Sequence, residues 1–163
     1  MLTIDPLAFR GCTELKEIHL PEGVTKIAYD TFSGCSNLSC ADLPGVKEID
    51  FNAFSGCTSL AGISLPEGLQ SIGPSAFDGC TALTELELPS EVSYIGNGAF
   101  SYCDELTSLI LPDNIEEIGN SIVDGCRNLK SITYKGISYT DTEELTEALK
   151  ADGVILGLNP FAI

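Results

Sequence analysis

The chain lacks several features that would point to a particular chemistry. It has one histidine and no C-x-x-C pair, so a zinc site has little support. It also has no D-x-[DN]-x-[DN]-G calcium loop, no glycine-rich phosphate loop and no serine nucleophile elbow. No stretch approaches the roughly 18 consecutive apolar residues that span a membrane. We therefore expect no metal, no cofactor and no membrane insertion.

Basic residues are missing from the middle of the chain. No Lys or Arg occurs between Lys47 and Arg127, a span with thirteen Asp and Glu residues, and the formal net charge is −16. Such a field repels nucleic acid and anionic lipid, and it attracts a cationic protein surface. The alternative is that the acidity serves only solubility. We expect no nucleic acid partner, and a cationic one if the charge has a role in recognition.

What the chain does contain is a repeat. Six cysteines recur at intervals of 23, 22, 23, 23 and 23 residues, at Cys12, Cys35, Cys57, Cys80, Cys103 and Cys126. A fixed period of roughly 20–29 residues is typical of a solenoid, in which each repeat is one coil stacked on the last. One coil cannot bury its own apolar face, so its apolar side chains must pack on their counterparts in the next coil.

The other repeat positions form columns. Leucine stands three residues after each cysteine, an apolar residue six after, and isoleucine eight before. The pattern L-x-x-I-x-L-P fits a strand that ends at proline, because proline has no N–H for a ladder. Stacking predicts a parallel sheet of about six strands. We expect second, shorter β segments at 24–27, 46–49, 69–72, 92–95 and 115–118, and a helical or 3₁₀ turn at each Ala-Phe-x-Gly-Cys. The 22-residue repeat has lost its residue in the turn at 43–46.

Residues 83–103, LTELELPSEVSYIGNGAFSYC, follow the pattern L-x-x-I-x-L-P-x-x-V-x-x-I-G-x-x-A-F-x-G-C almost position for position. The chain therefore resembles the BspA-like leucine-rich repeat family, from residue 4 to about 136. The resemblance implies a right-handed α/β solenoid, mostly β, of about six 23-residue coils with one parallel sheet. It also implies a part of a secreted or surface protein of bacteria or parasitic protists, associated with adhesion and protein binding. The family has no catalytic residues, so we expect no enzyme.

The chain divides into two regions, a solenoid at residues 1–136 with an incomplete first coil, and a C-terminal cap at 137–163. The sequence TDTE at residues 140–143 predicts a capping box ahead of a helix. Leu145 and Leu149 share a face of that helix with Ala148, and Gly153 is a stop signal. We expect the helix to close the last coil. An amphipathic helix that binds a partner is the alternative.

The start of the chain bears on localisation. Residues 1–6 have neither the basic start nor the apolar stretch of a signal peptide. Ile4 already occupies the isoleucine column, so the chain begins within a coil. We expect a secreted or cell-surface protein from which further repeats or a signal were removed, with a naturally short protein as the alternative. We expect a monomer, with end-to-end stacking as a further possibility at this uncapped end.

The cysteines favour a reduced ladder over disulfides. The six periodic cysteines share one column beside an apolar column, and repeating side chains stack in parallel instead of pointing at each other. We interpret them as small buried hydrophobes, and Cys40 as the one cysteine outside this column.

The strand positions five and seven residues after each cysteine face the concave side, where leucine-rich solenoids usually bind. The candidate binding face comprises Glu17, His19, Cys40, Asp42, Ser64, Glu85, Glu87, Ser108, Ile110 and Thr133. This face is small, polar and acidic and has no aromatic anchor, which predicts a weak platform. Tyr29, Tyr94 and Tyr102 lie on other faces and are alternative anchors.

One constellation on this face has the residue types of a catalytic or metal site. The register places His19 beside Asp42, and Cys40 beside Glu17. A Cys–His–Asp set can form a nucleophile system or a three-ligand metal site. An open sheet, however, offers no pocket to exclude water, so we expect neither.

Two interpretations of the function remain: a module that binds a cationic protein or host matrix, and a structural spacer that projects another domain.

Overall fold

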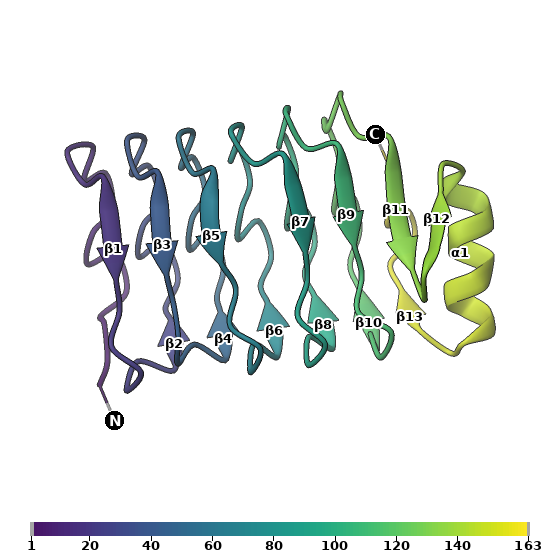
Figure 1. The fold of residues 1–163 in the computed structure, drawn as a ribbon, viewed down its shortest axis with the longest axis horizontal. Coiled ribbons are helices and arrows are strands. Elements are labelled where there is room, and N and C mark those ends of the chain that lie inside the picture. Colours follow the sequence, from purple (N-terminus) through teal and green to yellow (C-terminus); the bar gives the residue numbers. More distant parts are fainter. Residues whose placement is uncertain (1, 163) are drawn as a thin grey trace.

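The computed structural model describes residues 2–162, which form a solenoid of stacked coils with a helix at the C-terminal end (Figure 1). Each of the first five coils contributes one longer strand and one strand of two residues, and the sixth contributes a longer strand. The longer strands are β1 (Glu17–His19), β3 (Cys40–Asp42), β5 (Gly62–Ser64), β7 (Glu85–Glu87), β9 (Ser108–Ile110) and β11 (Ser131–Tyr134). The short strands are β2 (Lys26–Ile27), β4 (Glu48–Ile49), β6 (Ser71–Ile72), β8 (Tyr94–Ile95) and β10 (Glu117–Ile118). The expected strand positions are confirmed.

The short strands form one continuous sheet. Its order is β13-β10-β8-β6-β4-β2, where β13 (Ile155–Leu156) comes from the C-terminal region. All pairs are parallel, and each pairs an isoleucine with the isoleucine of the next coil, except that Leu156 takes this position in β13. The isoleucine column of the sequence is therefore the buried side of this sheet.

The longer strands differ from the expected single sheet. They are parallel and in the predicted register, but they form two separate groups, β1-β3-β5 and β7-β9-β11. In the second group β12 (Ile137–Tyr139) adds antiparallel to β11. The interruption lies between β5 and β7, which stand visibly further apart than the other neighbours (Figure 1). Gly62 in β5 has no side chain and the preceding Ala61 has a single methyl group, and both residue types have low strand propensity.

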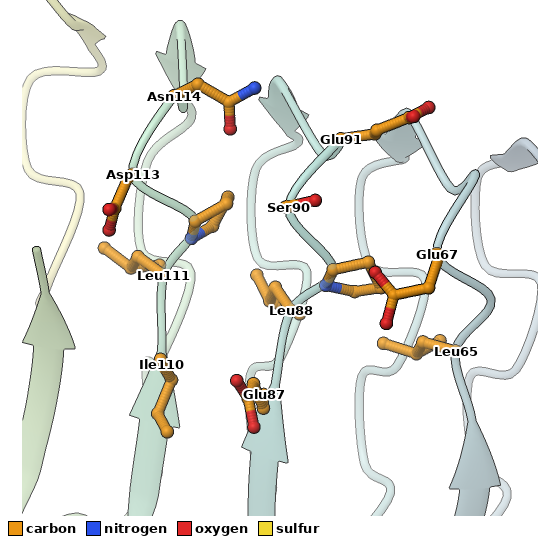
Figure 2. Close-up of a pocket in the computed structure, with 12 residues that line it drawn as sticks. Leu65, Glu67, Glu87, Leu88, Ser90, Glu91, Ile110, Leu111, Asp113 and Asn114 are labelled. Carbon is orange, nitrogen blue, oxygen red and sulfur yellow. The ribbon is translucent and has the colours of Figure 1, made fainter.

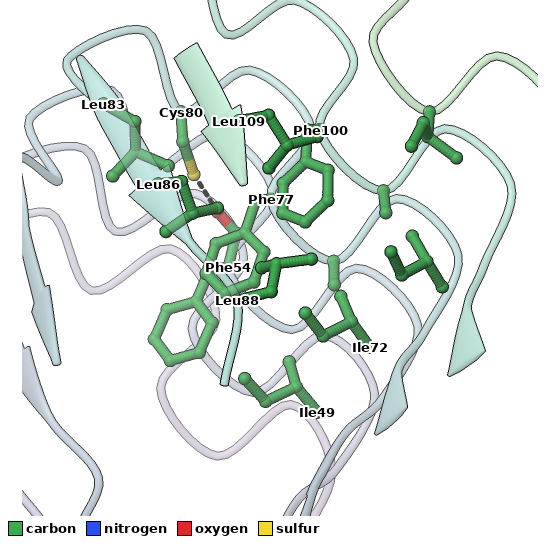
Figure 3. Close-up of a cluster of buried hydrophobic side chains, with 14 of the residues drawn as sticks. Ile49, Phe54, Ile72, Phe77, Cys80, Leu83, Leu86, Leu88, Phe100 and Leu109 are labelled. Carbon is green, nitrogen blue, oxygen red and sulfur yellow. Dashed lines mark hydrogen bonds between the residues drawn. The ribbon is translucent and has the colours of Figure 1, made fainter. Parts of the chain in front are cut away.

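Behind both groups runs an unbroken core (Figure 3). The rings of successive coils stack at centroid distances between 5.2 and 5.8 Å, in the order Phe9, Phe32, Phe54, Phe77 and Phe100. Each Ala-Phe-x-Gly-Cys stretch closes a tight turn, as in the 3.1 Å bond from Cys57 N to Phe54 O. The Phe column therefore ties all these coils together, including those on either side of the interruption.

The cysteine column packs against the phenylalanines. Five thiols of this column donate to the backbone carbonyl of the phenylalanine one coil earlier: Cys35, Cys57, Cys80, Cys103 and Cys126. The bond from Cys80 to Phe54 O is 3.2 Å long (Figure 3). All seven cysteines are free thiols. Burial raises the pKa of Cys57 to about 12 and also raises that of Cys80. Cys12 departs from the expected burial: it lies in the first described coil and is exposed, since no other described coil packs on that side of it.

The shortened turn of the second coil presses against the first coil. A Cβ added to Gly45 would lie 1.9 Å from the carbonyl oxygen of Glu22, whereas one added to Gly68, in the corresponding turn of the next coil, would meet nothing within 4 Å. Loss of one residue at 43–46 thus makes glycine the residue that fits there, since any side chain would clash with backbone.

Helix α1 (Thr142–Ala151) closes the C-terminal end of the solenoid (Figure 1). Its N-cap is Asp141, not Thr140 at the start of the predicted capping box, and the Asp141 carboxylate accepts from Glu143 N at 2.7 Å. Leu145 and Leu149 are fully buried, as expected. The helix stops before Gly153, whose φ of +79° suits glycine. Between residues 2 and 162 no helix is both long and apolar enough to cross a membrane.

Candidate functional site

The candidate binding residues lie in two groups, not on one continuous face. Glu17 and His19 on β1 pair in register with Cys40 and Asp42 on β3. Asp42 in turn pairs in register with Ser64 on β5. Glu17, His19 and Ser64 are exposed, and the other two are half-buried. This first group ends at the edge of β5.

The second group begins at the edge of β7. Glu85 lies beside Ser108 of β9, and Glu87 lies beside Ile110, which in turn lies beside Thr133 of β11. Both glutamates are exposed, and Ile110 is 36% exposed. The structure therefore brings together neighbours within each group but does not join β5 to β7.

The contacts that the structure shows within the His19 constellation are long. His19 Nδ1 lies 3.8 Å from Asp42 Oδ2, and His19 Nε2 lies 3.8 Å from Glu17 Oε2. Both distances exceed those of a hydrogen bond, and the His19 side chain is 64% exposed. No cluster of three or more His, Cys, Asp or Glu side chains suited to a metal ion occurs in the part of the chain that the structure describes.

A hollow lies where the middle coils leave the concave face (Figure 2). Its volume is about 600 Å³, and residues from three successive coils line it. Leu65 and Glu67 come from the coil of β5, Glu87 and Glu91 from that of β7, and Asp113 from that of β9. The hollow thus lies at the carboxyl ends of these strands, next to the interruption of the sheet, and its charged lining is acidic.

The acidic side chains of the middle coils have no ionic partners. The lysine and arginine ion pairs lie near the two ends of the chain, as when Lys26 Nζ contacts Glu48 at 2.7 Å and Asp50 at 3.0 Å. Hydrogen bonds with these two carboxylates raise the pKa of Lys26. Within residues 2–162, eleven other carboxylates form no salt bridge: Glu67, Asp78, Glu85, Glu87, Glu91, Asp104, Glu105, Asp113, Glu116, Glu117 and Asp124. The middle of the solenoid is therefore an uncompensated negative surface.

Exposed aromatic residues lie away from the concave strands. Tyr29, Tyr102 and Phe51 are 44%, 53% and 45% exposed, and Tyr94 on β8 is half-buried. Sequence reasoning named the three tyrosines but missed Phe51. Its signal was the column six residues before each cysteine, in which Tyr29 and Phe51 occupy adjacent coils joined by the 2.9 Å bond from Asp30 N to Phe51 O.

Comparison with solved structures finds bacterial leucine-rich repeat proteins. A T. pallidum leucine-rich repeat protein is 34% identical, with a TM-score of 0.80 over 97% of this chain and 78% of that one. One from Bacteroides ovatus is 42% identical, with a TM-score of 0.75 over 79% and 34% of the two chains. A leucine-rich cell surface protein from Faecalibacterium prausnitzii is 27% identical, with a TM-score of 0.70 over 77% and 35%. The chain spans about a third of the length of the last two.

Comparison with curated proteins gave no match. The BspA type leucine rich repeat region, in contrast, matches in six copies over residues 1–80 and 42–145. These matches cover the coils whose Leu, Ile, Phe and Cys columns form the core. The chain belongs to the BspA type leucine-rich repeat family.

Proposed function

We propose that this chain is a non-enzymatic protein-binding module of a secreted or cell-surface bacterial protein, and that its partner presents a cationic surface. The observation that carries the proposal is the set of eleven carboxylates in the middle coils that form no salt bridge. A solenoid supplies a rigid, extended scaffold on which such a surface can be displayed.

The charge distribution supports recognition over solubility. Solubility needs net charge but does not need one sign to be excluded from a long stretch of chain. Like charges close together repel each other and reduce the stability of the fold, and a cationic partner relieves that repulsion. Glu85 and Glu87 are two residues apart on β7, and both are exposed on the concave side.

The relatives support the location. The F. prausnitzii protein is described as a cell surface protein, and it shares the fold with this chain at 27% identity. A surface-exposed parent protein would present the acidic coils directly to proteins of its surroundings.

A structural spacer is the second candidate. The candidate binding face has few large side chains that could anchor a partner, which favours a spacer. Among the described residues of that face, Ile110 is the one large apolar side chain that is exposed. Binding hot spots are enriched in Trp, Tyr and Arg, and none of these occupies the candidate face.

The two functions can be separated by binding measurements on matched charge variants. The chain would be screened against basic host matrix proteins, and affinity compared between wild type, E85Q/E87Q and E116Q/E117Q. Both variants remove two negative charges, but Glu85 and Glu87 lie on β7 whereas Glu117 lies on β10 of the other sheet. We expect E85Q/E87Q to weaken binding about tenfold at low salt and E116Q/E117Q to change it little.

The outcomes distinguish the candidates. Binding that weakens steeply with salt and depends on Glu85 and Glu87 supports the module. Equal affinity for both variants and wild type would mean that the charge is only a solvated surface. Absence of any partner across the screen favours the spacer.

A further inference from the structure

The edges of β5 and β7 that face each other have unpaired backbone groups. Between β7 and β9, Leu88 N donates to Ile110 O at 3.0 Å, and Thr107 N donates to Thr84 O at 2.8 Å. One coil earlier, the equivalent donors are Leu65 N and Thr84 N. Neither forms such a bond within the described chain. Where β5 and β7 face each other, these backbone donors therefore have no partner in the described chain.

The apolar columns are also incompletely covered at this place. Ile63 and Leu65 are only partly buried, whereas the residues at the same columns one coil earlier, Ala41 and Leu43, are 1% and 0% exposed. The next strand, β7, keeps its own apolar residues buried, with Leu86 at 6%. We call the interruption between β5 and β7 the opening. Along β5 it offers both a hydrogen-bonding edge and an apolar surface.

The floor of the opening is intact. The rings of Phe54 and Phe77, from the coils on either side of the interruption, stack at 5.4 Å and are nearly parallel, with an angle of 2° between them. The short strands β4, β6 and β8 remain paired behind them. The interruption is therefore confined to the concave side, and its backing layer is preformed.

The charges around the opening are of one sign. Glu85 and Glu87 project from β7, and Glu67 and Glu91 line the hollow at the carboxyl ends of β5 and β7 (Figure 2). No Lys or Arg occurs from residue 48 to residue 126. A segment bound between β5 and β7 would therefore lie beside carboxylates, with no lysine or arginine of the middle coils to compete for them.

We infer that the opening between β5 and β7 receives an extended segment of another protein, which adds as a β-strand to these edges. Side chains of a strand point alternately to opposite faces. On such a strand, one set of side chains covers Ile63 and Leu65 and is branched and apolar. The other set lies on the concave side beside Glu85 and Glu87 and is basic. The segment is therefore of the type Lys-Ile-Lys-Leu, a mode of recognition in which backbone bonds give affinity and alternate side chains give specificity.

This inference rests on the proposed function, because it names the partner segment and the site on the same acidic coils. The probe is a synthetic peptide with the sequence Lys-Ile-Lys-Leu-Lys-Ile-Lys, added to the full chain. Two control peptides accompany it: one with every lysine replaced by glutamate, and one N-methylated at alternate residues, which loses backbone donors but keeps its charge.

Binding affinity and amide hydrogen exchange are the measurements. We expect the basic peptide to bind and to slow exchange at Leu65 and Thr84. Leu88, which already donates to Ile110, serves as the internal control and should change little. N-methylation should weaken binding by at least about tenfold, since it removes several backbone donors of the peptide at once. The glutamate peptide should not bind, and E87Q should bind the basic peptide less tightly than E117Q does.

The results separate this inference from the proposed function. If the basic peptide binds through Glu87 but leaves Leu65 and Thr84 exchange unchanged, and the N-methylated peptide binds equally well, strand addition is wrong and the acidic binding module stands. Slow exchange at Leu65 and Thr84 in the free protein would show that the edges close on each other, which also overturns the inference. If no basic peptide and no basic matrix protein binds, both proposals fail.

Discussion

The hydroxyl of Tyr134 on β11 donates a hydrogen bond of 2.9 Å to Oδ2 of Asp152, the C-cap residue of α1. Lys135 Nζ lies 2.8 Å from the same oxygen. Hydrogen bonds from Lys135 and Tyr134 hold the pKa of the Asp152 carboxyl below its ordinary value. Tyr134 itself is 2% exposed, so this bond fixes the end of the helix to the last coil.

Removing that hydroxyl should loosen the cap. We expect Tyr134→Phe to lower the free energy of unfolding by about 1–2 kcal/mol, because the hydroxyl bonds to a charged group. Tyr139→Phe is the matched control, since the Tyr139 hydroxyl forms no hydrogen bond within residues 2–162. Urea unfolding monitored by circular dichroism gives both values. Equal stability of the two variants would show that the Tyr134–Asp152 bond contributes nothing net.

Alkaline pH should destabilise the fold through its buried thiols. The pKa of Cys57 is about 12 in the folded chain, against an ordinary value of 9.0. Above pH 9 the unfolded chain loses this proton while the folded chain keeps it, so stability falls as pH rises and is fully present below pH 9. For this one thiol the loss approaches about 1.4 kcal/mol per pH unit between the two values.

Cys57→Ala isolates this effect. The variant loses some packing at every pH, but its free energy of unfolding should fall less between pH 9 and 11 than that of the wild type. Urea titrations at several pH values measure the two slopes. Parallel curves for variant and wild type would contradict the raised pKa.

Thiol labelling should separate the cysteines into two classes. Cys12 is exposed and Cys40 is half-buried, whereas the five column cysteines from Cys35 onward are 0–1% exposed and donate to backbone carbonyls. We expect Cys12 and Cys40 to react in the native chain at least about tenfold faster than the rest, because buried structural thiols are inert. Mass spectrometry of the labelled peptides reports the order. Fast labelling of Cys57 or Cys80 would show that the column opens.

The shortened turn should tolerate no side chain. Gly45→Ala places a Cβ against the Glu22 carbonyl, and we expect it to lower the free energy of unfolding by about 1–3 kcal/mol. Gly68→Ala in the next coil meets open space and should change stability by less than about 1 kcal/mol. Thermal unfolding of both variants compares them directly. A smaller effect for Gly45→Ala than for Gly68→Ala would mean that the first two coils are not in close contact.

The regular part of the fold could be predicted because each column repeats one physical requirement. Ile49 and Ile72 pair in the structure as their positions in the repeat indicated, and Phe54 stacks on Phe77 for the same reason. The register of His19 with Asp42 followed from the same counting. Six repetitions of one pattern leave little freedom in how the coils align.

The departures depend on local packing that the pattern does not contain. Gly62 occupies a normal strand position in the repeat, yet β5 does not pair with β7. Cys12 fits its column but is exposed at the end of the described solenoid. Asp141 caps α1 although Thr140 fits the capping-box pattern as well.

The interruption between β5 and β7 has a mechanical consequence. Elsewhere, adjacent coils are joined on both sides, by the long strands in front and by the short strands behind. Between the third and fourth coils the front connection is missing, so resistance to bending comes from the stacked phenylalanines, the short strands and the backbone bonds of the turns, such as that from Phe54 N to Ala76 O at 2.8 Å. We expect the curvature of the solenoid to vary most at this one joint. The two halves can then tilt as rigid arms, and a strand bound in the opening would lock the angle between them.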